Sequence, residues 1–255
     1  MYKRQGEDLR VLKAAHIINK DKICKIIILG DEAQIKADFA KNGWDLTGIE
    51  LINPATSPRL EEYASLLFEL RKSKGMTEEE AKKMALIPNY FGTLMIKSGH
   101  ADGMVSGANH STADTVRPAL QIIKSAHKDR AVSSFLVMVS NDKPYVFSDC
   151  AITINPSAKE LADIALETSL SAEKFGIEPK VAMLSFSTYG SGKGEQVDKV
   201  VEATKLAKEA LQSDEFKNMK IELDGELQAD AALDMVVARK KAPASHVAGN
   251  ANVLI

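Results

Sequence analysis

The side chains best suited to chemistry lie in a stretch of small and hydroxyl-bearing residues between Ser98 and Ile123. This stretch reads SGHADGMVSGANHSTADTVRPALQII, with a glycine- and serine-rich loop followed by an amphipathic helix that carries Arg117. Small residues let backbone N–H groups approach a ligand, and a helix N-terminus adds about half a positive charge. We therefore predict a site for phosphate or a phosphorylated ligand. The hydroxyl groups placed to donate to it are those of Ser106, Ser111, Thr112 and Thr115.

Arginine usage supports an anion site. The chain has seven arginines against 26 lysines, so arginine is not its routine surface charge. Arg117 is flanked by Val116 and Pro118 in a small, apolar helix, where a bound oxyanion would supply a partner. Arg71 ends a long helix before Gly75, and a surface charge is an equally good interpretation of it.

A second glycine cluster follows the expected strand Lys180–Phe186 and reads STYGSGKGEQVDKV. It is not a P-loop, because Gly194 stands where Ser or Thr must follow the lysine. The spacing of its glycines also departs from the Rossmann pattern. The glycine cluster either contacts a ligand or only forms a turn, and the residues leave both interpretations open. The place of the cluster after a strand slightly favours ligand contact.

Three further features have a structural and a functional interpretation. The acidic cluster DGELQADAA, expected directly after a strand, fits helix capping and ion pairing better than a metal site. His110 is expected to hydrogen-bond its own loop rather than to act as a base. Cys150 is expected to be a small buried side chain rather than a nucleophile. The carboxylates of the acidic cluster are those of Asp224, Glu226, Asp230 and Asp234.

Composition describes an ordinary globular protein of 255 residues, 45% hydrophobic and 27% charged. A net charge of −2 gives no reason to expect nucleic acid or an anionic membrane as a partner. Only Cys24 and Cys150 are present, without metal-ligand spacing, which favours a reducing cytoplasm and predicts no metal. No apolar run approaches the roughly 20 residues that span a bilayer.

Helices and strands are expected to alternate, which predicts an α/β fold with mainly parallel sheets covered on both faces. The change of character near residues 128–132 divides the chain into a first α/β domain, 1–130, and a second, 131–255. Helices are expected at Leu9–Ile18, Asp31–Lys41, from near Pro58 to Gly75, from Thr77 with a Thr77–Glu80 capping box, and at Ser157–Lys174, Glu195–Leu211 and Ala229–Arg239. Strands are expected at Cys24–Leu29, Ile49–Ile52, Ser133–Ser140, Pro144–Asp149, Lys180–Phe186 and Lys220–Asp224, with a hairpin turn at NDK between the third and fourth.

The two ends predict a truncated chain. It begins MYKRQ and enters a helix almost at once, and it stops at ANVLI, within an expected buried strand. Natural termini are usually polar and frayed. The alternative is a short protein whose last strand lies at a sheet edge.

The chain resembles the phosphate acetyltransferases of the phosphate acetyl/butyryltransferase family over almost its whole length. The segments that carry the resemblance are EDLRVLKAA, LRKSKGMT, GHADGMVSGANHSTADTVRPALQIIK, FSDCAITINPSAKELADIA, LSFSTYGSGKGEQVDKV, DGELQADAA and SHVAGNANVLI. The resemblance implies reversible acetyl transfer between coenzyme A and phosphate, by direct thiolate attack in a ternary complex. It implies two α/β domains similar to the isocitrate dehydrogenase fold, with the active site in the interdomain cleft. It also implies a cytoplasmic homodimer that needs no cofactor besides CoA or acetyl-CoA as substrate.

Site residues carry over from the resemblance one by one. Arg71 and Arg117 match arginines that bind the phosphate or CoA end of the substrates, and Ser111 and Thr112 match the loop that lines the pocket. The family's thiol base, an aspartate, and its serine–arginine pair match nothing before Ile255. We therefore expect this piece to bind weakly and to turn over poorly. The alternatives are a phosphate butyryltransferase, a catalytically silent regulatory domain of the same fold, and a related dehydrogenase.

Overall fold

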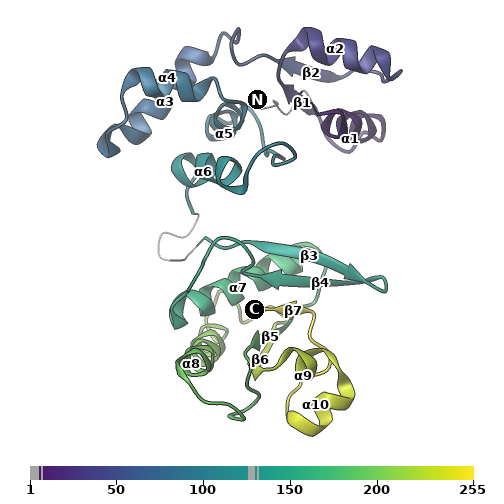
Figure 1. Ribbon diagram of the computed structural model, residues 1–255, viewed down its shortest axis with the longest axis vertical. Helices are drawn as coiled ribbons and strands as arrows, with labels where there is room; N and C mark the ends of the chain where they lie inside the picture. Colours follow the sequence, from purple (N-terminus) through teal and green to yellow (C-terminus); the bar gives the residue numbers. More distant parts are fainter. Residues whose placement is uncertain (1–5, 7, 126–129, 131) are drawn as a thin grey trace. The chain divides into compact units, whose positions relative to one another are not determined.

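The computed structural model describes residue 6, residues 8–125, residue 130 and residues 132–255. Two compact units divide the chain, Met1–Lys124 and Ser125–Ile255, and each is described by itself (Figure 1). The segment 128–132, where the sequence predicts the domain boundary, lies largely outside the described residues, as does MYKRQ at the start.

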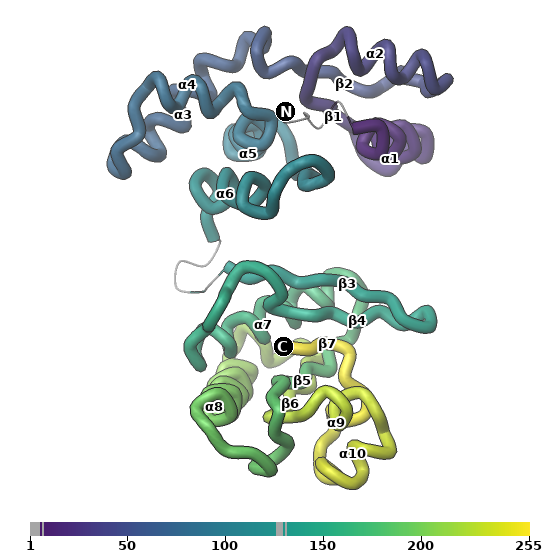
Figure 2. Tube along the Cα trace, viewed as in Figure 1, coloured from purple at the N-terminus to yellow at the C-terminus, as the bar shows by residue number. Residues whose placement is uncertain are grey.

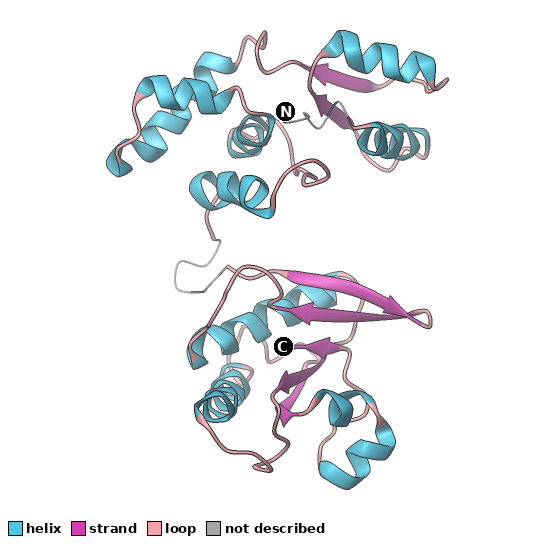
Figure 3. Cartoon of the chain, in the orientation of Figure 1, coloured by secondary structure: helices cyan, strands magenta, loops and turns pink. Residues whose placement is uncertain are grey.

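The first unit combines a two-stranded parallel sheet with a group of helices (Figures 1 and 3). Strands β1 and β2 pair in register, Ile26 opposite Ile49 and Leu29 opposite Ile52. The elements in chain order are α1 (Leu9–Lys20), β1 (Ile26–Leu29), α2 (Glu32–Lys41), β2 (Ile49–Ile52), α3 (Leu60–Arg71), the 3-10 turn η2 (Lys72–Lys74), α4 (Glu78–Ala85), α5 (Pro88–Lys97) and α6 (Thr112–Ile122).

Local sequence signals explain where these helices begin and end. Asp31 accepts the N–H of Gln34 and caps α2. The predicted capping box at α4 is confirmed, because Thr77 and Glu80 accept each other's backbone N–H groups. Gly75 ends η2 in the left-handed region at φ 86°, which glycine adopts without steric cost.

Two apolar clusters hold the first unit together. Leu12 of α1 and Phe39 of α2 are fully buried against Ile28 of β1. The larger cluster lies among α3, α4, α5 and α6, and it buries Leu67 and Ile122. Helix α5, to which the sequence analysis assigned no element, forms the centre of this cluster, since its first eight residues are all buried.

The second unit is a five-stranded sheet in the order β3-β4-β7-β5-β6, with helices on both faces (Figure 1). Helices α7 and α8 pack on one face, against Val181 and Met183 of β5. Helices α9 and α10 pack on the other, against Ala182 and Leu184. The elements are β3 (Phe135–Ser140), β4 (Lys143–Ser148), α7 (Ala158–Lys174), β5 (Lys180–Leu184), α8 (Glu195–Ala210), β6 (Glu222–Leu227), α9 (Ala229–Leu233), α10 (Met235–Lys241) and β7 (Val253–Leu254).

The last strand is central rather than at an edge. Strand β7 lies between β4 and β5, and both Val253 and Leu254 are buried (Figure 2). The alternative interpretation of ANVLI as an edge strand is therefore wrong. The predicted hairpin is confirmed, since β3 and β4 are antiparallel and Asn141 and Asp142 turn with positive φ angles.

Two boundaries differ from the sequence prediction. Strand β6 continues through Leu227, so Asp224 and Glu226 lie within the strand and not after it. The single helix expected over Ala229–Arg239 is two helices, because Asp234 leaves the helical conformation and accepts the N–H groups of Val236 and Val237 to start α10.

The predicted α/β class with mainly parallel sheets is confirmed. Every strand pairing in the described residues is parallel except that of β3 with β4. Among these residues no helix is long and apolar enough to cross a membrane.

Candidate functional site

The glycine- and serine-rich loop of residues 103–111 is hydrogen-bonded to residues of helices α5 and α1. Ser106 donates from Oγ to Oδ1 of the buried Asn89 at 2.8 Å. Arg10 of α1 donates to the carbonyl of Ala108 at 3.0 Å. Gly92 of α5 leaves room for a side chain of the loop, because a Cβ there would lie 2.6 Å from Sδ of Met104. The loop is therefore held in place by residues from two helices of the first unit.

Ser111 and Thr112, both predicted to bind the anion, stand at the start of α6. The Ser111 hydroxyl donates to Oδ2 of Asp114 at 2.7 Å and accepts the Asp114 N–H at 3.1 Å. This hydroxyl therefore acts as the helix N-cap. Thr112, the first residue of the helix, is exposed. Ser111 is exposed as well, but its hydroxyl is already engaged by Asp114.

Arg117 is more exposed than its apolar neighbours in the sequence suggest. Its side chain is 56% exposed, and its Nη1 lies 4.0 Å from Oδ1 of Asp114, one turn earlier. An exposed ion pair at this distance contributes little to stability. The guanidinium is thus accessible to an anion.

Arg71 ends α3 with its Nε atom buried and without a hydrogen-bond partner. Arg71 and Arg117 both lie close enough to Tyr90 of α5 for their charges to act on its phenol. Burial raises the pKa of Tyr90, and the charges of Arg117 and Arg71 oppose that rise. The charges of the two predicted arginines therefore both reach one tyrosine, whose hydroxyl donates to Oε1 of Gln121 at 2.8 Å.

Two more nitrogen atoms, in the glycine- and serine-rich loop directly before α6, are buried and unpartnered: Nδ2 of Asn109 and Nδ1 of His110. For Nδ1 of His110, the expected hydrogen bond within the loop is not made. Asn109 was not singled out from the sequence. Buried polar atoms are nearly always paired in native proteins, so atoms left unpaired at one place point to a ligand.

The second glycine loop, residues 187–194, is filled by the protein's own carboxylate. Glu226 of β6, 4% exposed, accepts from the hydroxyl of Ser187 at 2.8 Å and from the N–H of Gly190 at 2.7 Å. The N–H of Gly192 donates to Oγ of Ser187 at 2.9 Å. These donors therefore serve the loop's own structure.

The acidic cluster has the structural role predicted for it. Asp224 pairs with Nζ of Lys208 at 2.8 Å and also accepts from Tyr189 and Ser245. Burial alone would raise the pKa of Asp224, but these hydrogen bonds lower it on balance. Asp230 pairs with Nζ of Lys241 at 2.7 Å. Within the described residues, no group of three or more metal-ligating side chains comes together.

Cys150 is exposed, so the prediction of a small buried side chain is wrong. Partial burial and the neighbouring charge of Asp149 raise the pKa of its thiol, which disfavours the thiolate. Asp149 itself accepts the N–H groups of Ala151, Ile152 and Thr153 and the hydroxyl of Ser134. Its environment suits a loop anchor, not the activation of a nucleophile.

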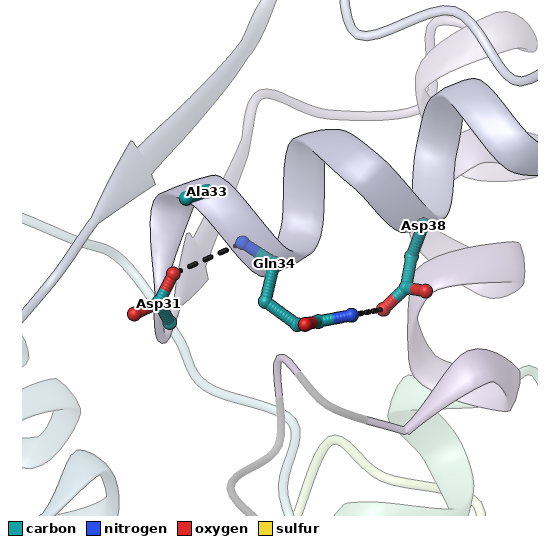
Figure 4. A pocket seen from close by; sticks show the side chains of 4 residues that line it. All are labelled: Asp31, Ala33, Gln34 and Asp38. Carbon is teal, nitrogen blue, oxygen red and sulfur yellow. Dashed lines mark hydrogen bonds between the residues drawn. The ribbon is translucent and has the colours of Figure 1, made fainter.

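Two surface hollows lie elsewhere on the first unit. The one on α2 is lined by Asp31 and Asp38, which hydrogen-bond Gln34 of the same helix (Figure 4). Its two carboxylates make it unsuitable for an anion. Another hollow, of about 430 Å³, includes Tyr63 and His100, which are hydrogen-bonded to each other at 2.8 Å. Neither hollow is lined by Arg71 or Arg117.

Several residues of this site were missed from sequence. Asn89 and Tyr90 stand in the apolar run IPNYFGTLMI, and both are buried. Polar side chains in such a run need buried partners, which was the available signal. The fold is thus that of an α/β protein, and the loop that leads into α6 holds buried nitrogen atoms without partners.

Comparison with known proteins identifies the family. Residues 4–255 match the model of the phosphate acetyl/butaryl transferase family, and the chain belongs to this family. It is 48% identical over 258 residues to the phosphate acetyltransferase of Clostridium acetobutylicum, covering 98% of this chain and 75% of that protein. It is 45% identical to the phosphate acetyltransferase of Nitratidesulfovibrio vulgaris, again over 98% of this chain but only 35% of that longer protein.

Solved structures agree. The EutD phosphotransacetylase from Staphylococcus aureus is 46% identical, with a TM-score of 0.86, covering 98% of this chain and 74% of that one. A branched-chain phosphotransacylase from Enterococcus faecalis shares the fold alone, at 17% identity and a TM-score of 0.57. The predicted function, phosphate acetyltransferase, is confirmed, and the longer-acyl alternative is not favoured.

Proposed function

We propose that the protein transfers an acetyl group reversibly between coenzyme A and inorganic phosphate, through a ternary complex. In the direction of acetyl-CoA synthesis, the CoA thiolate attacks the carbonyl carbon of acetyl phosphate. A carbon–sulfur bond forms, the carbon–oxygen bond to phosphate breaks, and phosphate leaves with the electron pair. No residue of the chain becomes acylated.

One observation carries this proposal for the chain itself: the buried Nε atom of Arg71 has no hydrogen-bond partner, and the charges of Arg71 and Arg117 both act on Tyr90. A phosphate dianion would neutralise both guanidinium groups and supply oxygen acceptors. The unpaired nitrogens of Asn109 and His110 offer further donors at the same loop. We assign Arg71, Arg117 and Thr112 to binding the anionic end of the substrates, with Ser111 fixing the helix start. No base for the thiol is assigned within the described residues.

Initial-rate kinetics test the reaction. With phosphate and acetyl-CoA both varied, a ternary complex gives intersecting reciprocal plots, whereas an acylated enzyme gives parallel ones. Comparison of acetyl-CoA with butyryl-CoA tests the acyl preference, for which we expect acetyl-CoA to have the higher kcat/KM. Parallel plots would overturn the direct mechanism, and a preference for butyryl-CoA would restore the longer-acyl alternative.

We also propose that the protein is a homodimer joined through its second unit. Strand β3 is the edge of the five-stranded sheet, yet Leu136, Val137, Met138 and Val139 are all exposed, Val139 to 71%. An exposed apolar edge strand is a place where another chain pairs. Sedimentation of Val139→Lys should show a weaker dimer than the parent chain. Equal dimerisation would move the interface elsewhere.

We propose the cytoplasm as the place of action. Both cysteines, Cys24 and Cys150, are free and exposed, which suits a reducing compartment. Its substrates in this proposal are acetyl-CoA, CoA, phosphate and acetyl phosphate.

A further inference from the structure

Helix α6 contains a proline in its middle, directly after the arginine of the anion site. Pro118 is buried and has no N–H, so the helical hydrogen bond to the carbonyl of Asp114, four residues earlier, is missing. A proline also disfavours the helical conformation of the residue before it, which here is Arg117. The backbone that directs Arg117 is thus the weakest part of the helix.

A side chain from α5 replaces the missing bond. Nδ2 of Asn89 donates to the carbonyl of Asp114 at 3.1 Å, and this is the carbonyl that Pro118 leaves without its helical partner. Asn89 is only 1% exposed, and its Oδ1 accepts from Ser106 of the loop. Both ends of its amide are therefore used, and its orientation is fixed.

The next residue of α5 holds α6 on the other side of Arg117. Tyr90 donates to Gln121, which lies one turn beyond Arg117 on the same helix face. Asp114 lies one turn before Arg117 on that face. Adjacent residues of α5 therefore bracket the arginine at both ends, and helices α5 and α6 pack in one apolar cluster (Figure 1).

We propose that Asn89 is a positioning residue of the anion site, which supplies the hydrogen bond that Pro118 removes from α6 and so fixes the direction of Arg117. This inference rests on the proposed function of Arg117 as a ligand of the substrate anion. Asn89 itself touches neither the anion nor the reacting atoms; it acts through α6.

A double-mutant cycle of Asn89→Leu with Pro118→Ala tests the pairing in the full chain. Alanine at 118 restores the N–H for Asp114, so the donor of Asn89 is no longer needed there. We expect Asn89→Leu to raise the dissociation constants for inorganic phosphate and CoA about tenfold, but less than about threefold in the Pro118→Ala background. Asn89→Leu should also lower the urea midpoint of unfolding, and this decrease should be smaller in the Pro118→Ala background.

Two controls separate this role from general damage. Tyr63→Phe removes a hydrogen-bonded hydroxyl from the apolar cluster of α3, α4, α5 and α6. It should leave the dissociation constants for phosphate and CoA unchanged. Ser106→Ala removes a bond from the loop to Asn89 but keeps Asn89 and Pro118, so it measures how much of the effect of Asn89→Leu comes from the loop. If Asn89→Leu alone yields no folded protein, recovery of folding by Pro118→Ala supports the pairing, and Asn89→Ala serves in the same cycle.

The outcomes distinguish this inference from the proposed function. Equal effects of Asn89→Leu in both backgrounds overturn the pairing of Asn89 with Pro118. If Arg117→Ala weakens phosphate binding while Asn89→Leu does not, the positioning role is overturned and the anion site stands. If neither variant changes phosphate or CoA binding, the anion site fails, and the positioning role fails with it.

Discussion

The two glycine-rich loops of this protein look alike in sequence and differ in what fills them. In the loop of residues 187–194, the carboxylate of Glu226 accepts from Ser187 and Gly190, so the donors are satisfied within the protein. In the loop of residues 103–111, nitrogens of Asn109 and His110 are buried without partners, and two arginines lie near Tyr90.

The difference teaches that glycine content marks where a backbone turns closely, not what it binds. A loop that carries its own anion is complete without a ligand. The loop whose donors remain unpaired is the one to which we propose that an anion from solution binds. Four predictions test this comparison.

The largest effect is expected from Glu226→Ala. It leaves the buried donors of Ser187 and Gly190 unpaired, which should cost about 2–4 kcal/mol in the free energy of unfolding. Phosphate affinity should not change. Urea denaturation measures the loss, and Glu195→Ala, which removes an exposed carboxylate of α8, is the matched control. If Glu226→Ala is as stable as the parent chain but binds phosphate differently, the loop of residues 187–194 takes part in phosphate binding and the contrast between the two loops is wrong.

Arg117→Ala should have the opposite effect: weaker phosphate binding with almost unchanged stability. Loss of a charge-assisted contact predicts dissociation constants for phosphate and CoA about tenfold higher or more. The free energy of unfolding should change by less than about 0.5 kcal/mol, because Arg117 is exposed and its ion pair with Asp114 is long. Isothermal titration calorimetry checks the affinity. Unchanged binding would remove Arg117 from the site.

The pH dependence of stability tests a second segment whose donors are satisfied by a carboxylate of the protein, that of Asp149. Burial alone would raise the pKa of Asp149. Hydrogen bonds from Ser134 and from three backbone N–H groups nevertheless hold this pKa well below its usual range. Its folded-state pKa is below its unfolded one, so the stability it contributes is present above about pH 4 and is lost as the pH falls further. Unfolding measured from pH 5 downward should show a shallower decline in Asp149→Asn. Parallel profiles would contradict the assignment.

Cys150→Ala should have the smallest effect. The thiol is exposed, and burial with the charge of Asp149 raises its pKa, so it is a poor nucleophile. We expect about half or more of the parent kcat in an acetyl-transfer assay. Mass spectrometry that detects acetylated Cys150 during turnover would show instead a covalent mechanism.

Local signals made much of the fold predictable. Strand β2 was predicted to the residue, and the caps at Asp31 and Thr77 were read correctly from neighbouring residues. The break between α9 and α10 was missed, because Asp234 fits a helix surface as well as an N-cap. Helix α5 was missed because a helix buried on nearly all sides has no amphipathic period.

The sequence by itself determined the alternation of elements, the glycine loops and the arginines worth testing, because these depend on residue type and short-range spacing. Only the tertiary structure decided which loop is filled from within, since Glu226 lies 36 residues from Gly190 along the chain. It also decided that Asn89 donates to the carbonyl that Pro118 leaves without a helical hydrogen bond, because the donor and the carbonyl of Asp114 belong to different helices. Hydrogen-bond satisfaction is a property of packing, and side-chain pairs distant in sequence meet only when the chain has folded.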